Sequence, residues 1–479
     1  MESLLEFALN YAGRLGSTYA EVRCRRDVSN AITMKNGEVQ FSGFLREFGV
    51  GVRLIVNGAL GFASTNMLNR KSIVDILSSA SSMAKASASY LSKPVRFSNE
   101  KIATDKWEVK QKVRFDSVSV KDKVELLSDI DKIFRSKHDV KFPSRLFILN
   151  ETLTEQIFMN SEGAVIRSKV PRISFSYILT AYTPGKGTVQ RFNKKGESRG
   201  WEAVTSWNLD RLASEEAEIL GRILTEGKKP PRGEFDIILG SEVVGIICHE
   251  SCGHPFEADR ILGREAAAAG ESFVNRSMLG EIIGSERVTI VDDPTIPNSY
   301  GYYLYDDEGV RASRRELIKR GVINTFLHNR ETAAVMGVKS NGAARSVSYS
   351  REPIIRMSNT YMERGEHSFE ELVESIREGV YIKSFMEWNI DDRRFNQRYV
   401  GLEAYRIRNG KITYPIRNPI LEITTPSLFM SVDAVGKELS FSAATCGKGD
   451  PMQGAPVWTG GPEVRLRNVR LGGFLNGAG

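Results

Sequence analysis

Two Asn-Gly pairs lie within the β-prone stretch AITMKNGEVQFSGFLREFGVGVRLIVNG, which covers residues 31–58. An Asn-Gly pair between two β-prone runs is the strongest short-range signal for a tight hairpin. Asn36-Gly37 and Asn57-Gly58 therefore predict strands that pair with their neighbours in sequence, in the antiparallel sense. The chain is expected to begin with an antiparallel sheet.

Helical and strand-like patterns surround this stretch. Apolar residues at i, i+3, i+4 and i+7 mark one face of a helix, and such patterns predict helices over residues 4–15, 73–83, 120–137 and 208–226. Strand-like sequence covers residues 19–26 and 145–182, the latter with a turn at residues 161–163. Because the strands come in hairpin clusters and do not alternate regularly with helices, the predicted fold class is α+β, with two domains of antiparallel sheets and packed helices.

The segment GKKPPRG, residues 227–233, is predicted to be a linker, because its prolines and glycines oppose regular structure. It separates an N-terminal α+β domain, residues 1–226, expected to serve in assembly and substrate access, from a C-terminal domain, residues 234–479. The second domain is predicted to contain a buried strand over residues 235–239, a helix over residues 242–254 capped by Ser241, and a helix over residues 368–378 that opens with a Ser-x-x-Glu capping box and stops at Gly379.

The composition narrows the class of protein. The chain has 479 residues, of which 41% are hydrophobic and 26% charged, and this ordinary globular balance argues against wholesale disorder. Its net charge of +7 is dispersed, which is a weak signal for nucleic acid. Four cysteines are too few for a disulfide framework in a chain of this length. With an acidic N-terminus and no apolar run of about 18 residues, the protein is expected to be cytoplasmic, with no membrane partner.

Two of the five histidines fall in one short motif, His249-Glu250-Ser251-Cys252-Gly253-His254. A His-Glu pair followed by a second His is typical of zinc hydrolases, in which two imidazoles bind the metal and the Glu transfers protons. This spacing predicts a metal-binding helix in the C-terminal domain.

The spacing of the two histidines does not suit a regular helix. Positions i and i+5 lie about 140° apart around an α-helix, whereas a π-type turn brings i+5 back over i. Gly253 offers backbone freedom, and Pro255 lacks the N–H that a continuing helix needs. The sequence therefore predicts a distorted or terminated helix over residues 252–255.

A catalytic zinc site needs a third protein ligand. Cys252, Glu257 and a distant residue such as Cys446 all remain candidates at this point. Core packing is favoured for Cys248 and Cys252, which are four residues apart and share a helix face. For Glu257 we favour a contact that orients an imidazole over direct binding of the metal.

Other polar segments have weaker interpretations. The acidic residues Asp292, Asp293, Asp306 and Asp307 lie in turn-like sequence, where capping and solvation are expected. The strand-like run over residues 354–362 is compatible with an edge that binds an extended peptide or with ordinary pairing inside a sheet.

Several segments together resemble the TldD/PmbA metallopeptidase family. The His-Glu-x-x-x-His signature of this family corresponds to His249, Glu250 and His254, and its Asn-Thr-Tyr-Met segment is similar to residues 359–362. Its cysteine-containing tail resembles Cys446-Gly447-Lys448, and its acidic turns resemble segments around residues 291–293 and 306–310. The resemblance is sharp over residues 234–465. This chain departs from the family pattern at Pro255, Cys248, Cys252 and Trp458.

The resemblance implies a zinc ion bound by His249, His254 and Cys446, with Glu250 as general acid/base for a zinc-activated water. Because these residues are all present, the chain resembles the active TldD type of the family. The expected substrates are short or unfolded peptides. The expected assembly is a dimer, formed with a second copy or with a metal-free PmbA-like relative.

Two rival functions are compatible with the same residues. One is a noncatalytic, nucleic-acid-associated regulator with a structural metal, which no aromatic-basic motif supports. The other has Cys252 or Cys446 as a nucleophile with a histidine as base. Loss of activity on chelation, reversed by added zinc, would argue against the cysteine nucleophile.

Overall fold

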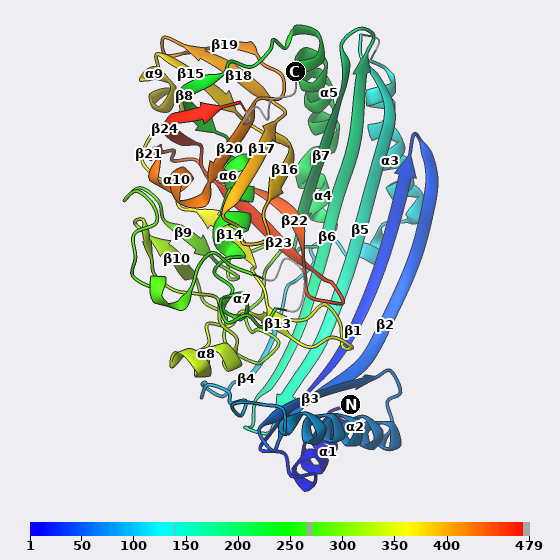
Figure 1. Cartoon of the computed structure of the whole chain (residues 1–479). Helices are drawn as coiled ribbons and strands as arrows, with labels where there is room; N and C mark the ends of the chain where they lie inside the picture. Colours follow the sequence, from blue (N-terminus) through cyan, green and yellow to red (C-terminus); the bar gives the residue numbers. More distant parts are fainter. Residues whose placement is uncertain (138, 266–270, 473–479) are drawn as a thin grey trace.

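The structure is a computed structural model, and it describes residues 1–137, 139–265 and 271–472. One long, curved sheet flanked by helices forms the N-terminal part, coloured blue to green in Figure 1. The C-terminal part, green to red, packs smaller sheets and short helices against one side of this long sheet. The mixed α+β class predicted from sequence is confirmed. Among the described residues, no helix is long and apolar enough to span a membrane.

The long sheet has seven strands in the order β3-β2-β1-β5-β6-β4, with β7 also paired to β6. Both Asn-Gly hairpins form as predicted, with Asn36 and Asn57 at positive φ, so β1, β2 and β3 are antiparallel neighbours. Only the β4–β6 pair in this sheet is parallel. The strands are β1 (Tyr19–Lys35), β2 (Glu38–Val56), β3 (Ala59–Thr65), β4 (Thr104–Glu108), β5 (Lys141–Asn160), β6 (Val165–Thr183) and β7 (Gly187–Glu197).

Helices cover this sheet in two separate groups. The amphipathic helices α1 and α2 share one apolar core with the β1–β3 strands, and α3 and α5 share another with β5 and β6. The side chain of Asn69 caps α2, and Ser119 forms a capping box with Asp122 at the start of α3. These helices confirm the predictions over residues 4–15, 73–83, 120–137 and 208–226. They are α1 (Glu2–Arg14), α2 (Arg70–Ala88), α3 (Val120–Arg135), α4 (Glu202–Trp207) and α5 (Leu209–Glu226), with a short 3-10 turn η1 (Phe115–Ser117).

The C-terminal part contains two larger sheets and a two-stranded one, β12-β13. The six-stranded sheet has the order β11-β10-β9-β14-β23-β22. The nine-stranded sheet has the order β16-β17-β20-β24-β8-β15-β18-β19, with β21 also paired to β24. Most pairs are antiparallel, and β14–β23 and β8–β15 are parallel. The strands are β8 (Gly233–Leu239), β9 (Ile290–Asp292), β10 (Arg315–Lys319), β11 (Val322–Ile323), β12 (Ala344–Arg345), β13 (Ile354–Ile355), β14 (Asn359–Met362), β15 (Glu378–Ile382), β16 (Phe385–Ile390), β17 (Asn396–Gly401), β18 (Ala404–Arg408), β19 (Lys411–Pro415), β20 (Ile420–Thr424), β21 (Val432–Val435), β22 (Ser440–Lys448), β23 (Gln453–Gly461) and β24 (Val464–Leu471).

The helices of this part are short. They are α6 (Ser241–Ile247), the π-helical turn η2 (Cys248–Gly253), α7 (Ala258–Ile261), η3 (Arg276–Met278), α8 (Arg330–Met336), α9 (Phe369–Glu374) and α10 (Thr425–Met430).

The helix predicted over residues 368–378 is shorter than expected. Ser368 forms the predicted capping box, but the helix α9 ends at Glu374. Gly379 belongs to β15, where a Cβ atom would lie 2.6 Å from the carbonyl oxygen of Asp236 on β8. The glycine therefore permits close packing of two strands and is not a helix cap. Ser241 is likewise not the N-cap of its helix, because Gly240 occupies that position.

Candidate metal centre

The helix that carries the two histidines changes type halfway along. It follows the buried strand β8, and its first part, α6, places five consecutive buried residues, 243–247, in the core of the C-terminal part. The next six residues form the π-helical turn η2, in which His254 N–H donates to the carbonyl oxygen of His249 at 3.1 Å. The predicted distortion is confirmed, although it begins at Cys248 and not at residue 252.

The π-helical turn brings the two imidazoles together. A five-residue repeat returns His254 to the side of His249, and the ring centroids lie 5.0 Å apart with an interplanar angle of 81°. Gly253 is needed at this turn because a Cβ atom there would lie 1.8 Å from Sδ of Met357. The local sequence thus folds so that residues five apart share one face.

Cys446 reaches the same point from near the end of the chain. It lies on β22, and its Sγ is 3.4 Å from Nε2 of His254. The donor atoms of His249, His254 and Cys446 all lie within 4.8 Å of one another, and all three residues are buried. In the part of the chain that the structure describes, this is the one cluster of three or more His, Cys, Asp or Glu residues able to hold a metal ion.

The cluster suits a zinc ion. Two imidazoles and a thiolate form a donor set that zinc prefers, and three ligands leave one position open for chemistry. Nδ1 of His249 is buried and has no hydrogen-bond partner among the described residues. Such an orphaned polar atom inside a ligand cluster fits a metal site better than a core of satisfied histidines.

The charges of the cluster reinforce one another. Burial opposes ionisation, but the neighbouring imidazoles of His254 and His249 hold the pKa of the Cys446 thiol well below its ordinary value. Burial also opposes the charge on His254, yet the Cys446 thiolate and Glu257 raise the pKa of this imidazole to about 9. The site therefore presents a thiolate, which is the form of cysteine that binds metals.

Glu257 and Lys448 fix the orientation of His254. Oε2 of Glu257 lies 3.0 Å from Nδ1 of His254, which directs Nε2 of the ring toward Cys446. The same carboxylate oxygen accepts a hydrogen bond from Arg260 at 2.8 Å and lies 3.2 Å from Nζ of Lys448. Lys448 and Cys446 are two residues apart on β22 and so share one face of the strand.

Glu250 adjoins the cluster but is held by an arginine. It is 8% exposed, and its carboxylate forms an ion pair with Arg394. Arg394 follows β16 in a turn and has a positive φ of 65°, and its carbonyl oxygen accepts a hydrogen bond from Thr425. The pair holds the Glu250 carboxylate next in sequence to His249.

Comparison with known families decides the class of protein. The models of the PmbA/TldA metallopeptidase match the chain in three segments: domain 1 over residues 20–84, the central domain over residues 114–226 and the C-terminal domain over residues 232–473. The chain belongs to the PmbA/TldD metallopeptidase family.

Curated relatives of this PmbA/TldD metallopeptidase match almost its whole length. A metalloprotease from Methanocaldococcus jannaschii is 32% identical, with 93% of this chain and 95% of that protein covered. A metalloprotease from Methanothermobacter thermautotrophicus is 33% identical, with 95% of each covered. A protein named zinc metalloprotease TldD homolog from Saccharolobus solfataricus is 28% identical, with 97% of this chain and 98% of that protein covered.

Solved structures share the fold. The chain superposes on a Thermotoga maritima protein with a TM-score of 0.78 at 18% identity, covering 98% of this chain and all of that one. TldE from Thermococcus kodakarensis gives a TM-score of 0.75 at 17% identity, with 98% and 100% covered.

Of the three candidates for the third ligand in this PmbA/TldD protein, only Cys446 belongs to the candidate metal group found among the described residues. Cys252 and Cys248 are fully buried in the apolar core and lie outside the candidate metal group. Glu257 contacts His254, as favoured from the sequence. Sequence reasoning missed Lys448, although its spacing of two from Cys446 was an available signal. It also missed Arg394, for which the sequence holds no signal, since 144 residues separate it from Glu250.

The capping predicted for the acidic turn residues is confirmed at Asp293 and Asp306, but the predicted solvation is wrong at Asp292 and Asp306, which are buried. Asp292 is fully buried and forms an ion pair with Arg315 at 2.6 Å. Asp306 is buried and accepts hydrogen bonds from three backbone N–H groups. The run over residues 354–362 offers no free edge at β14, which is paired on both sides, by β9 and β23.

Proposed function

We propose that this metallopeptidase hydrolyses peptide bonds with a zinc ion bound by His249, His254 and Cys446. The proposal is supported by one observation above all: donors 192 residues apart in sequence meet within 4.8 Å in a buried cluster. A curated relative named as a zinc metalloprotease adds to this support. The predictions of a cytoplasmic location and of a dimer, with a second copy or a metal-free relative, stay predictions.

Three residues near the candidate ligands have different roles in the proposed hydrolysis. When bound, zinc supplies Lewis acidity, which makes a water nucleophilic at neutral pH and polarises a carbonyl group. Glu250, next to the ligand His249, takes a proton from the attacking water and passes it to the leaving amine. Arg394 holds the Glu250 carboxylate in place through their ion pair. Glu257 keeps Nε2 of His254 aimed into the ligand cluster.

The burial of the site limits the substrate. The three candidate ligands are each at most 5% exposed, and Glu250 is 8% exposed. A folded protein surface cannot reach atoms at this depth, whereas a short or unfolded peptide can thread to them. We therefore infer that the substrates are short or unfolded peptides.

Two variants test the proposal. Glu250→Gln is expected to keep stoichiometric zinc and lose hydrolysis of a peptide library by about 10²-fold to 10⁴-fold. Cys446→Ala is expected to lose both zinc and activity. Glu286→Gln, at an exposed ion pair with Arg320, serves as the control and should change neither. Zinc content by mass spectrometry and hydrolysis rates are measured together. Full activity in Glu250→Gln, or full zinc content in Cys446→Ala, contradicts the proposal.

A cysteine nucleophile is the second candidate, because Cys446 and His254 resemble a thiolate–imidazolium pair. Treatment with a chelator, followed by addition of zinc, distinguishes the zinc mechanism from the cysteine mechanism. A metal-dependent enzyme loses activity and regains it, whereas a cysteine peptidase keeps its activity in chelator and loses it to a thiol-alkylating reagent.

A further inference from the structure

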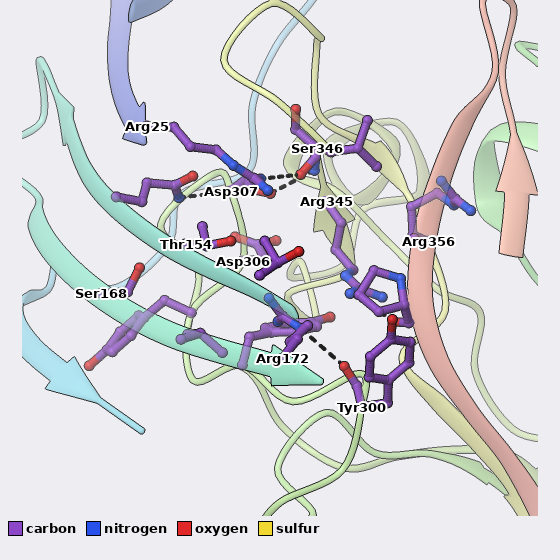
Figure 2. A pocket seen from close by; sticks show the side chains of 18 of the residues that line it. Arg25, Thr154, Ser168, Arg172, Tyr300, Asp306, Asp307, Arg345, Ser346 and Arg356 are labelled. Carbon is purple, nitrogen blue, oxygen red and sulfur yellow. Dashed lines mark hydrogen bonds between the residues drawn. The ribbon is translucent and has the colours of Figure 1, made fainter. Parts of the chain in front are cut away.

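A cavity of about 250 Å³ lies between the long sheet and the C-terminal part. Strands β5 and β6 form one wall, and β23 with the loops around residues 300–307 and 345–347 forms the other, as Figure 2 shows. None of the three candidate metal ligands lines it. Thr445 lines the cavity, whereas its neighbour Cys446 points from the opposite face of β22 toward His254.

Two arginines enter this cavity without an acidic partner. Arg172, on β6, donates to the carbonyl oxygens of Tyr300 and Tyr302 at 3.1 and 3.0 Å. Arg345 donates to the carbonyl oxygens of Met357 and Pro456 at 2.6 and 3.0 Å. Neither side chain contacts a carboxylate among the residues that the structure describes. The two side chains converge on the middle of the cavity (Figure 2).

The other charged groups of the cavity leave an excess of positive charge. Arg25 is paired with Asp27 at 2.7 Å. Burial and the nearby Glu308 raise the pKa of Asp306 well above its ordinary value. Asp307 accepts hydrogen bonds from Gln156 and from the backbone of Ser346. Arg356 also lines the cavity and donates to the carbonyl oxygens of Gln453 and Cys446.

The excess of positive charge affects the pKa of one of the arginines, Arg172. Burial and the positive charges of Arg345 and Arg25 lower the pKa of Arg172 to about 9. Two guanidinium groups that face each other in a partly buried space repel, and a bound anion relieves that repulsion. A guanidinium also binds a carboxylate through two parallel hydrogen bonds.

We propose that this cavity binds the terminal carboxylate of a short peptide through Arg172 and Arg345. The inference rests on the proposed function, since it assigns the cavity to the substrate or product of that reaction. Apart from Arg25, which is paired with Asp27, the lining holds three arginines, Arg172, Arg345 and Arg356, against Asp306 and Asp307, and this excess of one charge suits a monoanion better than a doubly charged phosphate. The volume corresponds to about eight waters at liquid density, which is room for the last residue or two of a peptide.

Calorimetry with a matched pair of ligands tests the site. The full chain, stripped of metal so that nothing is hydrolysed, is titrated with acetyl-Ala-Ala and separately with acetyl-Ala-Ala-amide, which lacks the charge. The acid is expected to bind at least about tenfold more tightly than the amide. Acetate and inorganic phosphate are titrated as free anions and should bind more weakly than the acid peptide.

Variants locate the binding. Arg172→Gln and Arg345→Gln are each expected to weaken binding of the acid at least about tenfold and to leave the amide unchanged. Arg172→Lys keeps the charge but not the two-pronged geometry, so it should lose less. Arg211→Gln, at an exposed pair with Glu215, is the control. If Arg345→Gln fails to fold, the comparison of Arg172→Gln with Arg172→Lys still shows whether the cavity binds the carboxylate.

Each outcome supports or overturns the proposal. Equal affinity for acid and amide, undetectable binding of the acid, or unchanged binding in the arginine variants overturns it. Phosphate that binds more tightly than the acid peptide also overturns it, because the site then prefers a free dianion. The proposed hydrolysis is judged separately from zinc content and the rate in Glu250→Gln. Either proposal can therefore fail while the other stands.

Discussion

Glu257 connects His254 of the candidate metal group to Lys448 on β22. It is fully buried, and although burial opposes its charge, Lys448 and His254 hold its pKa well below the ordinary value. The carboxylate therefore stays ionised and contacts Nδ1 of the His254 ring, so that Nε2 is the nitrogen directed toward Cys446 and the proposed metal donor. Lys448 links this carboxylate to the strand that carries Cys446.

Glu257→Gln should lower zinc affinity about tenfold to a hundredfold, because partners of ligating histidines contribute that much. The measurement is competition for zinc with a chelator of known affinity. Glu316→Gln, at an exposed pair with Arg314, is a matched control and should leave affinity unchanged. Zinc affinity in Glu257→Gln equal to that of wild type would mean that His254 is oriented by the fold alone.

At the scale of elements, the π-helical turn η2 decides whether two histidines five apart can share a ligand. It depends on Gly253, because the side chain of Met357 fills the space that a Cβ atom would need. The helix cannot simply shift, since residues 243–247 before it are packed in the core. The turn is thus held between a packed helix and a packed methionine.

Gly253→Ala should destabilise the protein by about 1–3 kcal/mol and weaken zinc binding, because the new methyl group collides with Met357. The double variant with Met357→Ala should cost less than the sum of the two single changes, since the shortened side chain removes the collision. Gly13→Ala, in α1 with nothing within 4 Å of the new Cβ, is the control. Melting temperature and zinc content give the readout, and strict additivity would contradict this explanation.

Elements set by local sequence were the ones that could be predicted. The two Asn-Gly hairpins need only positive φ at Asn36 and Asn57, and the distorted turn at the histidines follows from their spacing. The end of α9 could not be predicted. Gly379 looks like a helix cap in sequence, but it serves the contact of β15 with β8, whose partner residue Asp236 lies far away in the chain.

At the scale of the whole molecule, the two parts of the chain are joined by ion pairs. Arg53 of β2 contacts Glu308 of the C-terminal part at 2.8 Å, and both side chains are at most 3% exposed. Arg330 of α8 contacts Glu162, in the turn between β5 and β6, at 2.8 Å. Such contacts, like that of Cys446 with His254, join residues too distant for sequence patterns to reveal without the resemblance to a family.

Glu308→Gln is the change that should loosen this interface most. Glu308 accepts hydrogen bonds from Arg53 and from the backbone N–H of Arg330, so its loss leaves a buried arginine with less compensation. The expected cost is about 3–5 kcal/mol of stability, seen as a lower melting temperature, whereas Glu286→Gln at a surface pair should cost at most about 1 kcal/mol. Because the cavity lined by Arg172 and Arg345 lies between the same two parts, the variant should also bind acetyl-Ala-Ala more weakly. A melting temperature equal to that of Glu286→Gln would mean that the apolar contacts, and not this ion pair, hold the two parts together.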